Sequence, residues 1–160
     1  MHIITNMMIV DAMLQAVRDG RLANCDKTVA LWSELDAKYV SRYVDPVTEF
    51  RCAIGAALPP TAADKIAADD DWNGTIAWNV PWDEFGVEFE DLNFAAEIQH
   101  IHDISSTPSN WDTRDLRSLS ERLIGKPAVD HRIRLGRHTK TAAWWAEFLG
   151  LVKQHLETPV

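Results

Sequence analysis

Residues 6–20 read NMMIVDAMLQAVRDG, and this stretch predicts the first helix of the fold. Asn6 is a favoured N-cap, because its side-chain oxygen can accept a backbone N–H of the first turn. Gly20 follows as the left-handed residue at which helices commonly end. The helix predicted between them, over about residues 7–19, has apolar side chains around most of its surface, so we expect it to be deeply buried.

Four further stretches show the same kind of pattern. In each, a capping residue precedes apolar side chains that recur every three or four positions, which is the spacing of one helix face. The predicted helices cover about residues 27–43, 92–105 and 113–124, and a last helix that Thr139 or Thr141 opens runs to about Leu156. Two shorter segments also carry start signals: Asp45-Pro46 opens a segment from Val47 to Leu58, and Thr61 with Asp64 resembles a capping box.

Residues 72–90 are the least regular part of the chain. Asn73-Gly74 is a strong turn signal, and the four residues that follow it have the composition of a short strand. A small β-hairpin around residues 72–90 is therefore the one candidate for β-structure. We expect a mainly α, single compact domain over residues 1–160, with five to six helices.

The composition is that of an ordinary globular protein. The chain has 160 residues, of which 46 % are apolar and 25 % are charged. It contains no apolar run of about 18 residues, so no membrane contact is expected, and its first residues lack the features of a signal peptide. Two cysteines, Cys25 and Cys52, make no disulfide framework, and a reducing cytoplasm is the expected location.

The formal net charge of −8 is unevenly distributed. Residues 61–113 hold twelve acidic side chains and one basic side chain, whereas residues 114–140 hold eight basic and three acidic ones. This asymmetry predicts that the two segments face each other, that the acidic one meets a basic partner, or that the basic one contacts phosphates. Because the pI is near 5.1, direct binding of nucleic acid is not expected.

Cys52 is the first candidate for chemistry. A nucleophilic cysteine needs a helix N-terminus or a cation close to its sulfur. If a helix begins at Pro46, Cys52 lies nearly two turns inside it and gains little from the helix dipole. If residues 47–51 are extended instead, Cys52 opens the next helix and the geometry improves. The small residues that follow it favour a packing role, since cysteine is among the most buried residue types.

His102 and Asp103 are the candidate partners of Cys52. Catalytic residues of this kind are close in space and not in sequence, so a Cys52–His102–Asp103 site is conceivable. Neighbouring residues on a helix point about 100° apart, which makes Asp103 awkward for orienting His102. A histidine satisfied within the core is the competing interpretation.

No metal site is expected. His100 and His102 point about 200° apart on a helix, so they cannot share one ion. The run Asp69–Asp71 places Gly74 at the sixth position of a calcium loop, but Val80 stands at the twelfth, where a bidentate carboxylate is needed. We interpret the run as a solvated acidic loop.

Two short motifs resemble those of an uncharacterised family of small bacterial and phage proteins. One is Arg51-Cys52-Ala53-Ile54-Gly55 followed by Leu58-Pro59, an R-C-A-I-G…P element. The other is a Q-x-x-H-D…W element that runs from Gln99 through His102-Asp103 to Trp111. The resemblance implies a bacterial cytoplasm, or a host cytoplasm for a phage protein, and brings no activity with it.

Two functions follow from these patterns. The first is a binding or inhibitor module that presents an acidic, Trp-rich surface to a protein partner, itself basic or nucleic-acid-binding. The residues expected on that surface are Asp69, Asp70, Asp71, Trp72, Trp78, Trp82, Glu88 and Asp91. Burial of the same Trp side chains in the core is the competing interpretation. The alternative function is a Cys-dependent hydrolase or transferase that uses Cys52, His102 and Asp103, and neither function requires a cofactor.

Overall fold

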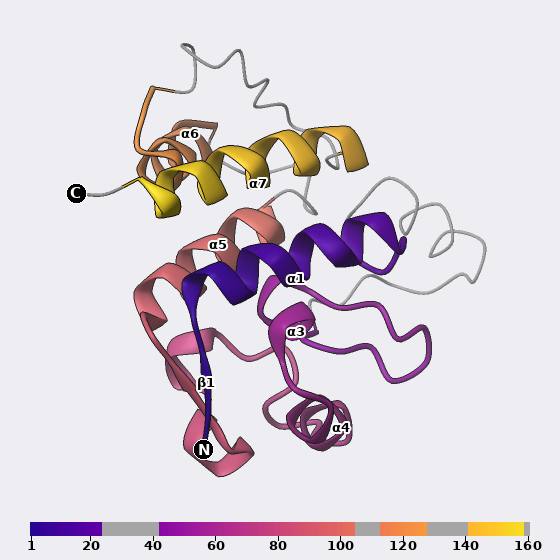
Figure 1. The fold of residues 1–160 in the computed structure, drawn as a ribbon. Helices are drawn as coiled ribbons and strands as arrows, with labels where there is room; N and C mark the ends of the chain where they lie inside the picture. Colours follow the sequence, from indigo (N-terminus) through magenta and orange to yellow (C-terminus); the bar gives the residue numbers. More distant parts are fainter. Residues whose placement is uncertain (24–41, 105–112, 128–140, 159–160) are drawn as a thin grey trace.

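The computed structural model describes residues 1–23, 42–104, 113–127 and 141–158 (Figure 1). Cys25, most of the helix predicted over 27–43 and residues 128–140 of the basic segment lie outside these ranges. The described residues form six α-helices, two short strands and two 3-10 helices: β1 (His2–Ile4), α1 (Asn6–Arg18), α3 (Ala53–Ala57), α4 (Pro60–Ala67), η1 (Ala77–Asn79), η2 (Trp82–Phe85), β2 (Val87–Phe89), α5 (Leu92–Ile104), α6 (Thr113–Ile124) and α7 (Ala142–Glu157). The predicted mainly α, single-domain fold is confirmed.

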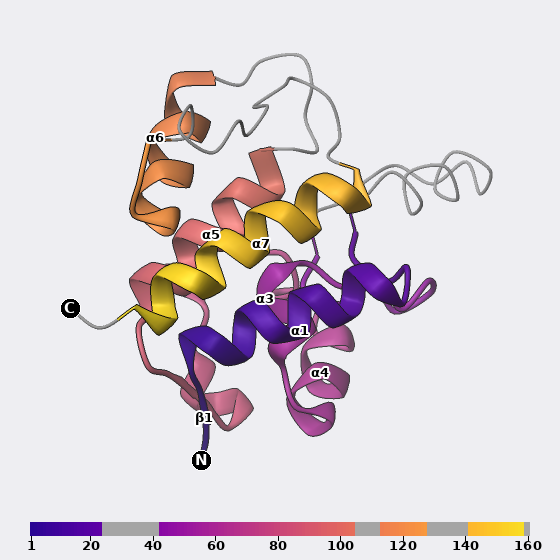
Figure 2. The same ribbon diagram turned by 45° about the horizontal axis from the view of Figure 1, so that its top comes forward.

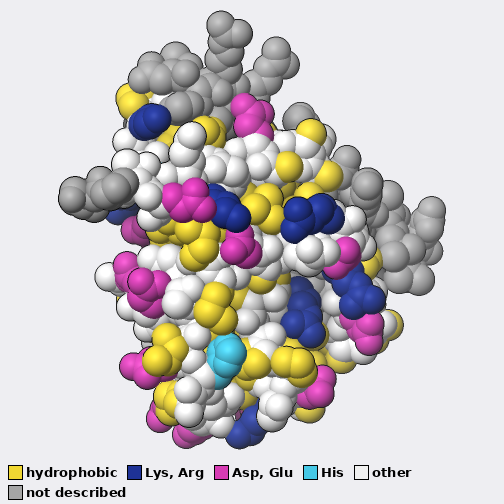
Figure 3. All heavy atoms as spheres, viewed as in Figure 1, with side chains coloured by type: hydrophobic (Ala, Val, Ile, Leu, Met, Phe, Trp, Pro, Cys, Tyr) yellow, Lys and Arg dark blue, Asp and Glu magenta, His cyan; other side chains and the backbone are white. Residues whose placement is uncertain are grey.

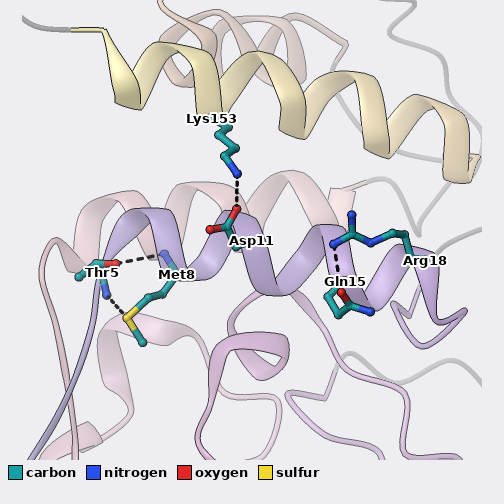
Figure 4. Close-up of polar contacts among 6 residues, drawn as sticks. All are labelled: Thr5, Met8, Asp11, Gln15, Arg18 and Lys153. Carbon is teal, nitrogen blue, oxygen red and sulfur yellow. Dashed lines mark hydrogen bonds and ion pairs between the residues drawn. The ribbon is translucent and has the colours of Figure 1, made fainter.

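Helix α1 begins one residue earlier than predicted, and its N-cap is Thr5 instead of Asn6. The Thr5 hydroxyl accepts the Met8 N–H at 3.1 Å, and the Met8 sulfur accepts the Thr5 N–H at 3.5 Å (Figure 4). Asn6 cannot be the cap, because it is already helical and its own N–H donates to Glu90 Oε2 at 2.8 Å. Gly20 does follow the helix with a left-handed φ of 67°, as its position predicts.

Helices α1 and α7 make the most extensive contact between two elements in the described ranges. They run side by side and antiparallel in both ribbon views (Figures 1 and 2), and α1 also packs on α3 and α5. Trp145, Phe148 and Leu149 of α7 are fully buried against this core. At the surface of the pair, Lys153 Nζ lies 2.9 Å from Asp11 Oδ1 (Figure 4). None of the helices in the described ranges is long and apolar enough to cross a membrane.

The helix predicted from Val47 to Leu58 is wrong for its first half. Asp45 Oδ1 accepts the N–H groups of Val47 and Thr48, which closes a tight turn in place of a helical one. Glu49 then adopts a left-handed φ of 64°, and Arg51 forms isolated bridges to Leu22 and Val44. The helix that remains is α3, five residues long.

Helix α4 occupies the place predicted for the short helix after Thr61, but the predicted capping box is absent from it. Its N-cap is Pro59, which makes no side-chain capping bond. Pro60 opens the helix, at a position where a missing N–H costs nothing.

The hairpin expected around residues 72–90 is also wrong. In the described residues, the strand of this segment is β2, which pairs in parallel with β1, so that Ile4 lies opposite Phe89. Asn73-Gly74 does form a turn, with φ of 105° at Gly74. However, the Asn73 side chain bonds to residues 43 and 44: its Oδ1 accepts the Tyr43 N–H at 2.9 Å, and its Nδ2 donates to the Val44 carbonyl at 2.8 Å. The turn therefore meets a distant segment instead of folding a hairpin back on itself.

Candidate functional site

A cavity of about 260 Å³ lies between residues 42–43, the start of α3, residues 74–78 and α5. Its floor is made of buried side chains: Tyr43, Cys52, Ala77 and Gln99. Its rim carries residues with exposed or half-buried side chains: Arg42, Thr75, Ile76, Trp78, Ala96 and His100. The cavity thus joins segments that are far apart in the sequence.

Cys52 is the N-cap residue of α3, as in the alternative in which residues 47–51 are extended and Cys52 opens the next helix. Its sulfur accepts the Gly55 N–H at 3.4 Å. The residue is buried, with an exposed fraction of 1 %. A sulfur in this position satisfies one of the open N–H groups of the helix and also fills core volume.

The His102 side chain points away from the cavity and into the core. It is fully buried, and its Nε2 lies 2.7 Å from the backbone oxygen of Ala23. Its ring also lies against Trp145, with 6.0 Å between the ring centroids. His102 does not line the cavity, whereas His100 does. The side chain of Asp103 lies outside the described residues.

Gln99 and His100 are the site residues that the sequence analysis missed. Gln99 Oε1 accepts the Ile54 N–H at 2.9 Å, which fixes α5 against the start of α3 beside Cys52. Both residues lie in the Q-x-x-H-D element, which also contains His102 and Asp103, the predicted partners of Cys52. The missed signal was helical geometry: one turn of α5 aims Gln99 and His100 toward the cavity and His102 toward the opposite side.

The acidic residues of the predicted binding surface divide into two groups. Asp69 and Asp91 have structural contacts, since Asp69 Oδ1 accepts the N–H groups of Asp71 and Trp72, and Asp91 Oδ1 accepts those of Asn93 and Phe94. Asp70, Asp71 and Glu88 have exposed side chains. Asp83 and Glu84, which belong to the same acidic segment, are exposed as well.

The three Trp residues of that surface lie at different depths. Trp82 is buried at 6 % exposure, donates its indole N–H to the Ala77 carbonyl at 2.9 Å and packs edge-on against Tyr43 and Phe89. Trp72 is half-buried against the core. Trp78 has an exposed fraction of 53 %, and the neighbouring Ile76 has 67 %. Of the three, Trp78 is the one placed to contact another molecule.

The carboxylates of residues 69–91 form no ion pair with any Lys or Arg that the structure describes. Lys65, the one basic residue of the acidic segment, directs its ammonium to the Glu84 backbone oxygen and lies 5.5 Å from the centre of the Phe85 ring. In the described ranges, the basic and acidic segments meet at Arg122 and Glu97, 3.3 Å apart. Figure 3 shows acidic side chains gathered at the lower left, over the region of η2 and β2.

In the part of the chain that the structure describes, no three His, Cys, Asp or Glu residues are grouped so that they could hold a metal ion. The resemblance carried by the motifs around Cys52 and His102 rests on those residues alone, since no protein-family model, no curated protein and no solved structure matches the chain.

Proposed function

We propose that the protein is a binding module for a basic segment of a protein partner, with an inhibitor as one form that such a module takes. The acidic surface is defined here as the exposed carboxylates of Asp70, Asp71, Asp83, Glu84 and Glu88. The observation that carries the proposal is that no described Lys or Arg forms an ion pair with these carboxylates. A partner rich in Lys and Arg supplies the missing charges.

The acidic surface is drawn from elements that touch. Helix α4 contacts η2, and the donation from Lys65 to the Glu84 backbone joins them directly. Asp70 and Asp71 follow the end of α4, whereas Asp83 and Glu84 belong to η2. Like charges held near one another repel, so a complementary partner gains free energy by neutralising them, and it is steered toward them before contact.

Trp78 supplies the apolar part of such a contact. Tryptophan is enriched among the residues that carry most of the binding energy in protein interfaces. The indole of Trp78 stands on η1, which packs on α5, so it is held on an ordered element. Its exposed neighbour Ile76 extends the same apolar patch.

The structure identifies which carboxylates can be changed without harming the fold. Asp69 and Asp91 accept backbone N–H groups, and Glu90 accepts the Asn6 N–H, so reversing their charges would disturb local structure as well as binding. Asp70 and Glu84 have exposed side chains and suit a test by charge reversal. The matched control is reversal of Glu147 and Glu157, which are exposed on α7.

The test uses a synthetic peptide in which Arg and Lys alternate with Leu, and it measures binding by isothermal titration calorimetry. We expect D70K/E84K to weaken binding about tenfold or more, and W78A to weaken it as well, with melting temperatures unchanged. We expect E147K/E157K, which changes the net charge by the same amount, to bind like the wild type. Raising the ionic strength should weaken wild-type binding, because exposed charges are screened.

If D70K/E84K and E147K/E157K lose the same affinity for the peptide, net charge alone attracts it, and the proposal would fail. It would also fail if the wild type did not bind the peptide at low ionic strength. If D70K/E84K lowers the melting temperature, the single variants D70N and E84Q repeat the comparison with smaller changes.

A further inference from the structure

We propose that the cavity beside Cys52 binds a small anionic ligand, namely a carboxylate or phosphate joined to a flat apolar group. This inference is separate from the acidic surface, because the charged residues that carry it, Arg42 and His100, have the opposite sign; Trp78 and Ile76 border both sites. It concerns binding and involves no covalent step at the Cys52 sulfur.

The charge of the lining carries the inference. Although the chain has a net charge of −8, none of the Asp and Glu residues that the structure describes lines this cavity. Arg42 and His100 line it instead. Arg42 is half-buried, and no carboxylate that the structure describes pairs with its guanidinium. A guanidinium beside a hollow is a favourable partner for an anionic oxygen, because its planar fork matches carboxylate and phosphate geometry.

The remaining walls suit a flat apolar group. Trp78 and Ile76 stand at the rim with much of their side chains exposed, and Ala77 and Ala96 add small apolar surfaces. An aromatic ring placed against the Trp78 indole would remove apolar area from water on both partners. His100, exposed at the rim, adds a ring nitrogen that can donate a hydrogen bond to the anion.

The floor of the cavity is already ordered. Gln99 Oε1 accepts the Ile54 N–H, and the Tyr43 hydroxyl donates to the Thr75 backbone oxygen. Tyr43 also packs edge-on against Trp82, with 5.1 Å between the ring centroids. A ligand that enters a preformed site pays less entropy for ordering its surroundings. The volume of about 260 Å³ is just below the roughly 300–1,000 Å³ of sites for drug-sized ligands, so the ligand is small.

The test titrates three probes into the ¹⁵N-labelled protein: phenyl phosphate, benzoate and the neutral benzyl alcohol. We expect both anions to shift the backbone amides of residues 74–78 and 96–100, and benzyl alcohol to bind about tenfold more weakly or not at all. Whichever anion binds more tightly identifies the headgroup as a phosphate or a carboxylate. Either preference supports the shared chemistry.

Variants then test the cation. We expect R42Q to lower the affinity for the tighter anion about tenfold and R42K to restore part of it, since lysine keeps the charge but loses the fork. The control is R18Q, which removes one positive charge from an exposed site on α1 and should leave the affinity unchanged within about twofold. R42Q should leave binding of the basic peptide intact, so failure of either proposal is recognised separately.

Three results would overturn the inference. The first is amide shifts confined to other regions of the protein, and the second is equal affinity for benzyl alcohol and the anions. The third is the absence of binding by any probe. If R42Q does not fold, the location of the wild-type shifts and the comparison of charged with neutral probes still decide the question.

Discussion

The Nε2 atom of His102 lies 2.7 Å from the backbone oxygen of Ala23, although the two residues are 79 positions apart. This contact ties the last turn of α5 to the segment that follows α1. The His102 ring also lies against Trp145, so the same side chain touches α7. A fully buried imidazole with a carbonyl partner is a structural element of the core, because an unpaired polar group there would be costly.

Replacement of His102 should therefore destabilise the fold. H102A removes the hydrogen bond to Ala23 and leaves a cavity beside Trp145, and we expect a loss of roughly 2–4 kcal/mol in the free energy of unfolding. The matched control is H100A, two positions away, where the side chain is exposed and the change should be within about 0.5 kcal/mol. Urea unfolding followed by circular dichroism measures both values. Similar values for the two variants would contradict the structural role given to His102.

The Q-x-x-H-D element around His102 lies on α5, where Gln99 and His100 line the cavity and His102 is buried in the core. Helical periodicity located α5 to within a residue of its observed end, because apolar spacing depends on the helix alone. It could not tell which histidine meets the cavity, since that depends on where α3 and residues 74–78 pack. The partner of His102 is a backbone atom, which leaves no trace in side-chain patterns.

The ion pair between Asp11 and Lys153 should give a small alkaline dependence of stability. The hydrogen bond from Lys153 to Asp11, together with the negative charge of Asp11, raises the pKa of Lys153 above its usual 10.5. The charged form is therefore favoured in the folded state. This contribution is fully present below pH 10.5 and is lost as the pH rises through the raised folded-state pKa.

A double-mutant cycle over D11N, K153Q and the double variant measures the coupling between the two side chains. Because both are substantially exposed, we expect a weak coupling that high salt reduces further. The coupling energy should decline above pH 10.5. A coupling energy that does not change over that pH range would show that charge is not its source.

Cys52 should resist alkylation in the folded protein. In a C25S background it is the remaining thiol, and its exposed fraction is 1 %. Iodoacetamide reaches such a sulfur through local opening, so we expect modification roughly a hundredfold slower than in the urea-unfolded chain. Rapid modification of the native protein would instead favour the Cys-dependent enzyme. A variant with S118C as its single thiol provides the exposed reference, because Ser118 lies on the surface of α6.

The errors in the predicted fold share one physical cause. Asp45-Pro46 and Asn73-Gly74 are both genuine local signals, and both lie in turns. Beyond each turn, the chain pairs with residues that the local sequence does not contain: Arg51 bridges to Leu22, Asn73 bonds to Tyr43 and Val44, and β2 pairs with β1 at the start of the chain. Such long-range pairing overrides local preference, and periodicity in a single sequence does not report it.

Replacement of glycine by alanine should have opposite effects on stability at Gly55 and at Gly150. A Cβ added at Gly55 would lie 1.7 Å from the Tyr43 backbone oxygen, and that oxygen also accepts the Cys52 N–H. We expect G55A to cost roughly 3 kcal/mol or more, because backbone atoms on both sides must move and the floor of the cavity moves with them. At Gly150, inside α7, an added Cβ meets nothing within 4 Å, and G150A should stabilise the protein by about 0.5–1 kcal/mol. Thermal and urea unfolding of both variants test the pair, and a G55A protein as stable as the wild type would contradict the close approach of α3 to the Tyr43 backbone.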